Sequence, residues 1–297
     1  MPIRRRFPTI LLLTFLASSG GCESRTNDAT STERNNEPPS ADLRIVSLAP
    51  HLAELVFAVG AGDLLVGVTS YTDYPEAAAA LPLVGDAFAV DQEQLAVLKP
   101  DLLLAWKSGT AAHVVDELEI RGYRVETIET RGVEDVAAAL KRIGRLTGHV
   151  SDGAAAAEDF RQGLRQLAER YRESPAISVF YQVSSRPLYT VNGDHYVSEL
   201  IEICGGRNIF DDLDNLAPMV DVEAILARDP EVLLASDDSE DDAFDVWQRW
   251  PDLAANRYGN YFFVPADEIG RPTPRLLQAG KRLCETMERA RENKRSR

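Results

Sequence analysis

Six side chains that could contact a ligand follow apolar runs of the sequence, at the points where buried strands are expected to end. They are Tyr71, Asp73, Tyr74, Phe88, Trp106 and Arg271. Open α/β sheets collect ligand contacts outside the carboxyl ends of their strands, so we expect these six residues to line a cleft. For Tyr71 and Tyr74, surface packing of a loop is the alternative interpretation. His51 is a further candidate, in a loop expected before a helix that starts near residue 52.

No arrangement of residues typical of an enzyme active site stands out in the sequence. There is no G-x-S-x-G elbow, no H-E-x-x-H helix, no P-loop and no G-x-G-x-x-G after an expected strand. The four histidines lie in unrelated local settings without paired spacing, so a protein-bound zinc ion is not expected. We therefore assign no catalytic residue and no metal ligand, and favour binding over catalysis.

The elements that must position these side chains include a unit that occurs twice. Residues 91–106 read DQEQLAVLKPDLLLAW, and residues 221–236 read DVEAILARDPEVLLAS. In each copy a short helical pattern ends at a proline, which lacks the N–H that a continuing helix needs. The runs that follow are apolar throughout, as expected of parallel strands that helices cover on both faces. Glu93 and Glu223 occupy equivalent places near the starts of the two copies.

A second similarity supports an internal duplication. Residues 54–60 read ELVFAVG and resemble residues 199–205, which read ELIEICG; both are typical of a helix that closes on glycine. Chance recurrence of common α/β elements is the alternative, but two similarities in the same order favour duplication. We therefore predict an α/β protein with two similar lobes.

The order of the expected elements sets the boundaries of these lobes. The first lobe is expected to span residues 43–150 and the second residues 174–293, with a last helix that Pro274 opens and that runs through Cys284. Between them, residues 152–171 contain no proline and carry apolar residues at helical spacing, which predicts a helix roughly 30 Å long. An ordinary core helix is the alternative, but its position between the lobes indicates a bridge over residues 151–173.

Charge and the N-terminal pattern restrict where the protein acts. The net charge of -15 argues against binding of nucleic acid or of an anionic membrane by the protein surface itself. The basic residues 4–6, the apolar run 10–17 and the small residues up to Cys22 are typical of an export signal, and the run is too short to span a bilayer. We expect removal of residues 1–21, and the polar residues 22–42 should form a flexible tether.

The segment that ends at Cys22 resembles a bacterial lipoprotein signal, in which the cysteine becomes the lipid-modified first residue of the mature protein. Ser19 replaces the leucine that is usual three places before the cysteine. The resemblance implies a lipoprotein anchored to a membrane in the periplasm or another extracytoplasmic compartment. Cleavage that leaves Cys22 as an unmodified thiol is the alternative.

Two further cysteines, Cys204 and Cys284, remain as an even pair in an oxidising compartment. A disulfide between them would close a loop of about 80 residues and contribute roughly 3 to 5 kcal/mol to the free energy of unfolding. Two buried free thiols are the alternative.

Six segments together resemble the cobalamin-binding proteins of bacterial ABC importers. They read RIVSLAPH, SYTDYP, VGDAF, LKPDLLLAW, ICGGRNIF and RPTPR, and the resemblance covers residues 44–287. The resemblance implies the fold of the substrate-binding proteins in which one rigid helix joins two Rossmann-like lobes, with the ligand cleft between the lobes. The sequence departs from the family pattern at Ala87, where an aromatic residue is common, and at residues 268–270, where an aromatic pair often precedes the arginine.

The resemblance also implies a function and partners. Cobalamin or another corrinoid would lie in the cleft as a transported ligand rather than a cofactor, and a monomer would deliver it to the permease and ATPase of an ABC importer. In this family, glutamates at the positions of Glu93 and Glu223 contact the permease, and Cys204 and Cys284 match a disulfide. Stabilisation of helix starts is the alternative role of the two glutamates. A haem or ferric-siderophore receptor of the same class is the alternative function, and an extracytoplasmic enzyme on this fold is a third.

Overall fold

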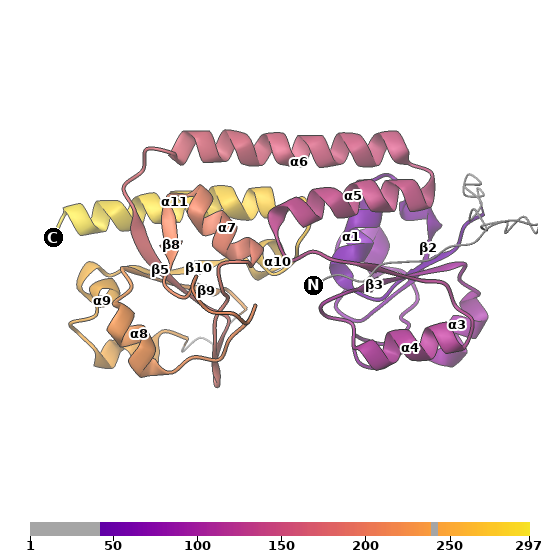
Figure 1. The fold of residues 1–297 in the computed structure, drawn as a ribbon, viewed down its shortest axis with the longest axis horizontal. Helices are drawn as coiled ribbons and strands as arrows, with labels where there is room; N and C mark the ends of the chain where they lie inside the picture. The colour runs from indigo at the N-terminus through magenta and orange to yellow at the C-terminus, as the bar shows by residue number, and fades with distance from the viewer. Residues whose placement is uncertain (1–41, 239–242) are drawn as a thin grey trace, which may run out of the picture. The chain divides into compact units, whose positions relative to one another are not determined.

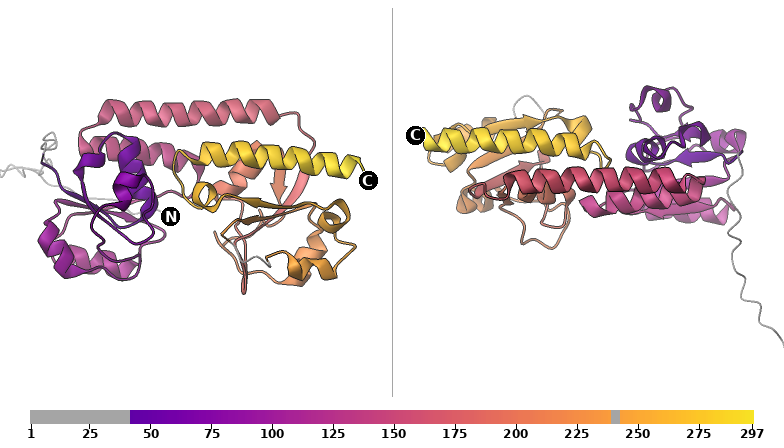
Figure 2. Two further views of the ribbon diagram at one scale, coloured as in Figure 1. Left: turned by 180° about the vertical axis from the view of Figure 1, so that it is seen from behind. Right: turned by 90° about the horizontal axis from the view of Figure 1, so that it is seen from above.

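The computed structural model describes residues 42–238 and 243–297 (Figure 1 and Figure 2). The predicted signal peptide, residues 1–21, and the predicted lipidation site, Cys22, lie outside these residues, as does the predicted tether apart from its last residue. In the described part of the chain, no helix is both long enough and apolar enough to cross a membrane.

The first lobe is built on a parallel four-stranded sheet in the order β2-β1-β3-β4. Its strands are β1 (Ile45–Ser47), β2 (Leu65–Val68), β3 (Leu102–Trp106) and β4 (Val125–Ile128). Its helices are α1 (Pro50–Ala58), α2 (Glu76–Ala79), α3 (Gln92–Leu98), α4 (Ala112–Ile120) and α5 (Val133–Thr147), with a short 3-10 helix at Gly62–Leu64. The two central strands, β1 and β3, are buried almost throughout, which explains their continuous apolar sequence.

The second lobe repeats this topology in a parallel sheet of the order β8-β5-β9-β10. Its strands are β5 (Ile177–Gln182), β8 (Gly206–Asn208), β9 (Val232–Ser236) and β10 (Tyr261–Val264), and a hairpin of β6 (Ser184–Ser185) and β7 (Leu188–Tyr189) follows β5. Its helices are α7 (Tyr196–Ile203), α8 (Val222–Arg228), α9 (Ala254–Tyr258), α10 (Ala266–Ile269) and α11 (Leu276–Arg295), with a 3-10 helix at Asp245–Arg249. The predicted fold of two similar α/β lobes is confirmed.

The repeated unit of the sequence keeps its details in both lobes. Asp91 and Asp221 each accept a hydrogen bond from the backbone N–H three residues further on, at 2.9 and 2.7 Å, and so cap α3 and α8. Both helices end on a residue in the left-handed conformation, Lys99 with φ 48° and Asp229 with φ 43°. In each lobe a proline and a buried strand follow. These shared caps support a duplicated unit.

Two helix boundaries differ from the predicted ones. α1 begins at Pro50 rather than near residue 52, because proline fits the first turn of a helix, where its missing N–H has no partner to lose. His51, predicted to lie in a loop, therefore belongs to the first turn of α1. α11 continues beyond Cys284 to Arg295, since the residues after Cys284 are mostly good helix formers without glycine or proline.

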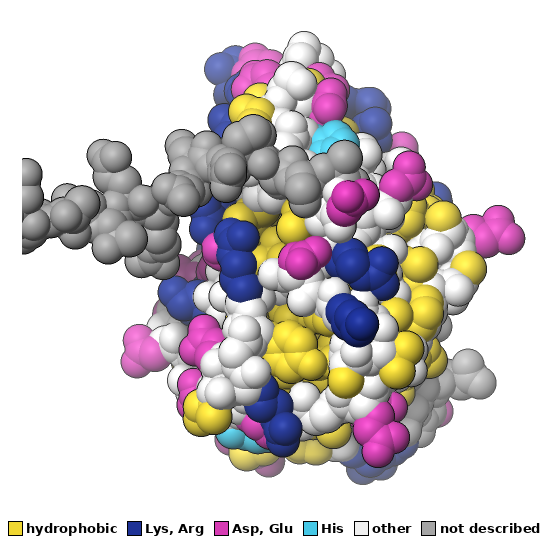
Figure 3. Space-filling model, turned by 90° about the vertical axis from the view of Figure 1, so that its right-hand side faces the viewer, with side chains coloured by type: hydrophobic (Ala, Val, Ile, Leu, Met, Phe, Trp, Pro, Cys, Tyr) yellow, Lys and Arg dark blue, Asp and Glu magenta, His cyan; other side chains and the backbone are white. Residues whose placement is uncertain are grey.

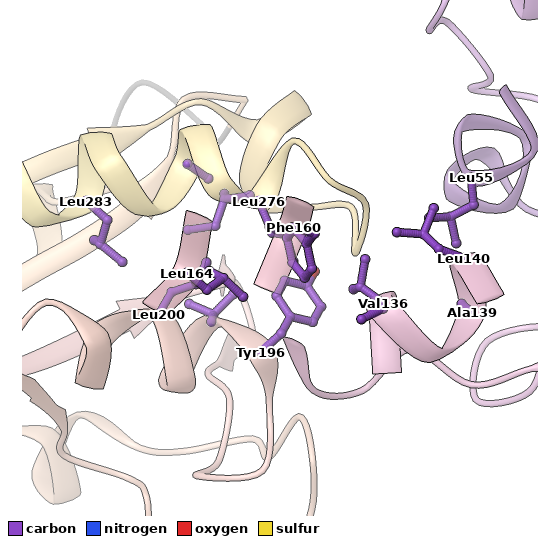
Figure 4. Packing of buried hydrophobic residues seen from close by; sticks show 14 of the residues in the cluster. Leu55, Val136, Ala139, Leu140, Phe160, Leu164, Tyr196, Leu200, Leu276 and Leu283 are labelled. Carbon is purple, nitrogen blue, oxygen red and sulfur yellow. The ribbon is translucent and has the colours of Figure 1, made fainter. Parts of the chain in front are cut away.

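α6 (Val150–Tyr171) packs against α5 of the first lobe and against α7 and α11 of the second. Its apolar stripe, which includes Phe160, is buried. Phe160 belongs to one hydrophobic cluster that also contains Leu140 of α5, Leu200 of α7 and Leu283 of α11 (Figure 4). The two lobes therefore share one continuous core, which opposes movement of one lobe against the other.

A disulfide joins Cys204, at the end of α7, to Cys284 in α11. Both cysteines are fully buried. The two bonded residues are 80 positions apart in the sequence. The bond therefore links two helices that also pack against each other in the second lobe.

Candidate ligand-binding site

A cavity of about 380 Å³ lies at the carboxyl ends of three strands of the first lobe and reaches a loop of the second lobe. Its lining comes from residues 48–51, 69–71, 86–88, 109–110 and 270–271, and from Trp106. Most of these residues lie at or just after the carboxyl ends of β1, β2 and β3. Parallel strands that end at the same edge of a sheet bring the segments that follow them together.

Four of the six predicted site residues line this cavity, and the other two lie beside it. The four are Tyr71, Phe88, Trp106 and Arg271. Asp73 instead pairs with the guanidinium of Arg271. The ring of Tyr74 lies against the guanidinium of Arg275, whose central carbon is 4.3 Å from the ring centroid. Asp73 and Tyr74 therefore support the arginines near the cavity rather than lining it.

The rings of Tyr71 and Phe88 are exposed, with relative exposures of 84% and 75%. Local backbone features place both residues. Tyr71 has φ 66°. Residues other than glycine rarely adopt this conformation, and those that do are often found at functional sites. Asp86 accepts hydrogen bonds from the N–H groups of Phe88 at 2.8 Å and Ala89 at 2.9 Å, which fixes the loop and lowers the pKa of the Asp86 carboxyl. Two large apolar rings thus border the cavity with much of their surface free for a ligand to bury.

Trp106 lines the cavity from the end of β3. Its backbone N–H donates a hydrogen bond to the hydroxyl of Thr110 at 3.0 Å. A Cβ atom on Gly109 would lie 1.8 Å from the indole carbon Cε3, so the indole can keep this position only with glycine at 109. Among the described residues, no atom accepts a hydrogen bond from the buried indole Nε1. This N–H is therefore a donor that a ligand could use.

His51 packs its ring edge-on against Trp106, with 5.1 Å between the ring centroids. Its Nε2 lies 3.3 Å from the hydroxyl oxygen of Thr130. Burial, and then the positive charge of Arg271, lower the pKa of His51 from 6.5 to about 3. The imidazole is therefore neutral at neutral pH and adds an uncharged aromatic surface to the cavity.

Arg271 belongs to the second lobe but is held by residues of the first. Its Nη1 donates hydrogen bonds to Glu54 at 3.0 Å and to Asp73, and its Nη2 donates to the carbonyl oxygen of Tyr71 and to Asp73, at 2.9 Å each. The hydrogen bonds from Arg271, followed by its charge, hold the pKa of Asp73 below its usual range. Two carboxylates thus neutralise the guanidinium at the wall of the cavity.

Glu54 and Arg275, neither of which was predicted as a site residue, complete this network. Arg275 donates to both carboxylate oxygens of Glu54 at 3.1 Å and to Asp267 at 3.0 Å. Glu54 therefore accepts hydrogen bonds from two arginines of the other lobe. A signal was present, because Glu54 is an acidic residue on the buried face of α1, and buried carboxylates need a partner.

Comparisons with known proteins assign the chain to a family. Residues 45–258 match the model of the family described as periplasmic binding protein. The chain belongs to this family. Over 242 residues it is 34% identical to the vitamin B12-binding protein of Vibrio cholerae serotype O1, a match that covers 81% of this chain and 87% of that protein. As a periplasmic binding protein, the chain is a substrate-binding component of ABC import rather than an enzyme.

Solved structures agree with this family assignment. The crystal structure of the periplasmic vitamin B12-binding protein of Vibrio cholerae has a TM-score of 0.74 and 33% identity, and covers 84% of this chain and 97% of that chain. A periplasmic haem-binding protein from Pseudomonas aeruginosa has a TM-score of 0.71 and 27% identity, over 81% of this chain and 91% of that chain. The predicted resemblance to a binding protein of an ABC importer is confirmed, and so is the periplasmic location in its general form.

The two departures from the family pattern, at Ala87 and at residues 268–270, can now be located in the structure of this periplasmic binding protein. Ala87 and Gly270 both line the cavity and leave its wall small at these points. Phe88 supplies a ring next to Ala87. Glu268 is buried and receives a hydrogen bond from Arg282 of α11 at 2.9 Å, so it acts as an ion-pair partner and does not line the cavity.

Glu93 and Glu223 lie in the first turns of α3 and α8. Both side chains are exposed. Within residues 42–238 and 243–297, neither carboxylate takes part in an ion pair or a side-chain hydrogen bond. Figure 3 shows the end of the molecule where α3 lies in Figure 1, and there apolar side chains are exposed between acidic and basic ones. The two glutamates are thus equivalent in the two lobes and accessible to a partner.

Proposed function

We propose that this protein captures cobalamin or a closely related corrinoid and delivers it to the permease and ATPase of an ABC importer. The composition of the cavity carries this proposal. Aromatic rings and a neutral imidazole surround a space in which Arg271, the one lining arginine among the described residues, is already paired with carboxylates.

The aromatic residues fit the faces of a broad, flat macrocycle. Tyr71, Phe88 and Trp106 would bury corrin surface, and a well-placed ring contact contributes about 0.5 to 1.5 kcal/mol beyond the area that it buries. The buried hydroxyl of Thr69, like the indole N–H of Trp106, has no hydrogen-bond partner among the described residues. Both residues line the cavity, so these two polar atoms are suited to the amide side chains that surround a corrin.

The charge of the cavity favours a corrinoid over haem or a ferric siderophore. Haem carries two carboxylates, and anionic groups of this kind are usually met by unpaired arginines or lysines. Asp86 and Arg271 are the charged residues in the described lining, and Arg271 is neutralised by Glu54 and Asp73. A ligand that presents neutral amides fits this environment better. The higher identity to proteins named for vitamin B12 than to the haem-binding protein points the same way.

Co-elution of ligand with the protein tests this proposal. The purified protein is mixed separately with cyanocobalamin, haemin and ferric siderophores, desalted, and its absorption spectrum is recorded. We expect the visible bands of cyanocobalamin to remain with the protein. Retention of haemin or a siderophore without retention of cyanocobalamin would overturn the proposal in favour of the alternative function. Phe263→Ala, which removes an exposed ring outside the cavity lining, is the control for loss of an aromatic side chain.

In this proposal, the permease contacts each lobe through one carboxylate, and the two carboxylates occupy equivalent positions. Glu93 and Glu223 would meet basic residues on a two-fold symmetric permease, since charge pairs at the rim of an interface mainly set orientation and association rate. The lobes would span residues 43–150 and 174–293, with residues 151–173 as a bridge that holds the two carboxylates in register.

A lipid at Cys22 would keep the protein, as a monomer, near the membrane that holds the importer. One acyl-modified cysteine followed by a tether would leave the lobes free to turn toward the permease. Mass spectrometry of the N-terminal peptide from the membrane fraction tests this part. An unmodified Cys22 in that peptide would exclude the anchor.

A further inference from the structure

Two glutamates at equivalent positions of the two lobes contact the opposite lobe. Glu54 lies in α1, which precedes β2, and Glu199 lies in α7, which precedes β8. Because the two sheets have the same strand order, and because residues 54–60 resemble residues 199–205, α1 and α7 are equivalent helices. A contact made by one glutamate can therefore be compared directly with the contact made by the other.

Glu54 reaches the segment of the second lobe between α10 and α11. It accepts hydrogen bonds from Arg271 at 3.0 Å and from Arg275 at 3.1 Å. Glu54 has a relative exposure of 5%, so water screens these ion pairs little. Loss of its charge would leave two guanidinium groups without their shared buried partner.

Glu199 reaches the segment of the first lobe between β4 and α5. Its Oε1 accepts a hydrogen bond from the N–H of Val133, the first residue of α5, at 3.2 Å. A Cβ atom on Gly132 would lie 2.5 Å from the same oxygen, so glycine at 132 allows the carboxylate to approach. Next to it, the N–H of Tyr196 donates to the carbonyl oxygen of Arg131 at 2.8 Å.

The two contacted segments are equivalent as well. Each follows the last strand of its sheet, β10 or β4, and leads into a long helix, α11 or α5. We propose that Glu54 and Glu199 form a reciprocal clasp, in which each lobe holds the segment before the long helix of the other lobe, and that Glu54 is a positioning residue that fixes Arg271 at the ligand cavity. The clasp needs no ligand, whereas the role of Arg271 in binding rests on the proposed function.

The two halves of the clasp depend on different chemistry. Glu54 meets two positive charges, so its function requires a carboxylate. Glu199 meets a backbone N–H, for which any carbonyl-type oxygen at the same place is a sufficient acceptor. Burial raises the pKa of Glu199, and the nearby charges of Asp135, Glu202 and Asp194 raise it further, so its environment disfavours the charged form. Glutamine should therefore preserve the contact between the lobes at position 199 but not at position 54.

Hydrogen–deuterium exchange of the full chain without ligand tests the clasp. Glu199→Ala should speed exchange in peptides that contain Val133 and Tyr196 by roughly tenfold, the factor expected for a lost buried acceptor, and Glu199→Gln should restore the original rate. Glu54→Gln should speed exchange of residues 269–275 by a similar factor. Glu202→Gln removes an exposed carboxylate from the same helix as Glu199 and should change neither rate. Unchanged exchange in Glu54→Gln and Glu199→Ala would overturn the clasp.

Affinity for cyanocobalamin, followed by tryptophan fluorescence, tests the positioning role. Glu54→Gln should weaken binding about tenfold or more, because Arg271 loses the charged partner that fixes it, while Glu202→Gln should bind as the parent does. Unchanged affinity in Glu54→Gln would overturn the positioning role. If the parent binds no corrinoid, the proposed function fails, and the exchange experiment still decides the clasp.

A second variant covers the case in which Glu54→Gln does not fold. Arg275→Gln removes part of the same pairing from the other lobe and leaves Arg271 in place. It should speed exchange of residues 269–275 by a smaller factor than Glu54→Gln. Unchanged exchange in Arg275→Gln would count against the clasp in the same way.

Discussion

The two lobes share a scaffold but differ in what they present at the carboxyl ends of their strands. Both sheets have the same strand order, and both carry the same capped helix before the central strand β3 or β9. In the first lobe β1 runs directly into α1, and the loops around it line the cavity; in the second lobe the hairpin of β6 and β7 separates β5 from α7. The two lobes therefore share the scaffold and differ in the segments that follow its strands.

The lobes also differ in what stabilises the helices behind their sheets. In the second lobe a disulfide joins α7 to α11. The equivalent helices of the first lobe, α1 and α5, pack without such a bond, because the chain has three cysteines and none lies between residues 23 and 203. In the first lobe α1 and α5 are joined by packing alone, and the ion pairs of Glu54 join α1 to the second lobe.

The largest expected effect concerns the bond that the first lobe lacks. Replacing Cys204 and Cys284 with alanine should lower the free energy of unfolding by roughly 3 to 5 kcal/mol, because the unfolded chain gains the freedom of a loop of about 80 residues. Urea unfolding of the double variant and its parent measures the difference. Hydrogen–deuterium exchange should speed up in α7 and α11 more than in α1 and α5. An equal increase of exchange in both lobes would contradict the expectation that the disulfide stabilises the second lobe more than the first.

The next effect concerns two histidines at the starts of the equivalent helices, of which His51 is buried and His195 partly buried. Burial, followed by an arginine charge, lowers the pKa of His51 to about 3 and that of His195 to about 4. Because both folded pKa values lie below the unfolded value of about 6.5, the unfolded state binds protons first as the pH falls. Stability is therefore present at pH 7 and above, and each histidine removes about 2 kcal/mol of it by pH 5.

Variants of the two histidines separate the contributions of the lobes. His51→Gln and His195→Asn should each reduce the loss of unfolding free energy between pH 7 and pH 5, measured by urea unfolding at both pH values. Asparagine at 195 can still cap α7, where the ring nitrogen of His195 accepts from the N–H of Val197. His113→Gln, at an exposed position of α4, is the matched control. A parent protein that is equally stable at pH 5 and pH 7 would contradict both assignments.

The sequence predicted the scaffold well because its signals are local. Apolar runs located the parallel strands, and the prolines after α3 and α8 marked where two helices end. The start of α1 was misplaced because Pro50 was interpreted as part of a loop, although proline also fits the first turn of a helix. The end of α11 was misplaced because no breaker residue follows Cys284 to mark it.

The candidate site could be predicted only in part. Tyr71 and Trp106 line the cavity because they lie at or just after the carboxyl ends of β2 and β3, a position that sequence order reveals. Phe88 follows no strand directly in the described structure. Its loop reaches the same edge of the sheet because the N–H of Ser70, just after β2, donates to the carbonyl oxygen of Gly85. The partner of Arg271 could not be predicted in this way. Arg271 bonds Glu54, which is 217 positions away in the chain, and no local pattern relates the two residues. Contacts between the lobes depend on tertiary packing, and no short segment of a single sequence reveals which residues will meet.

Loss of an aromatic wall in the first lobe should have the next largest effect. Trp106→Ala should weaken corrinoid binding by about 1 to 3 kcal/mol, the range for a lost buried ring contact. Titration of tryptophan fluorescence or calorimetry measures the affinity, with Phe263→Ala as the control in the second lobe. Unchanged affinity in Trp106→Ala would remove this residue from the site.

The equivalent carboxylates on the two lobes should affect transport without affecting affinity. Glu93→Lys combined with Glu223→Lys should abolish uptake through the cognate importer and leave the dissociation constant for cyanocobalamin unchanged, because both residues lie outside the cavity lining. Each single variant should retain part of the uptake, since one lobe still presents its carboxylate. Normal uptake by the double variant would leave stabilisation of the helix starts as the explanation of both glutamates.

The smallest expected effect is the movement of one lobe against the other when ligand binds. The lobes share one core through α5, α6, α7 and α11, and no glycine-rich hinge interrupts α6. Small-angle scattering curves with and without cyanocobalamin should therefore nearly superpose, and a large fall in the radius of gyration would contradict this. Glu54→Gln sharpens the test, because loss of the clasp should allow a ligand-dependent change that the parent does not show. If the shared core alone prevents closure, the scattering curves of Glu54→Gln will superpose as well, and the ion pairs of Glu54 then serve to place Arg271 rather than to keep the two lobes in a fixed arrangement.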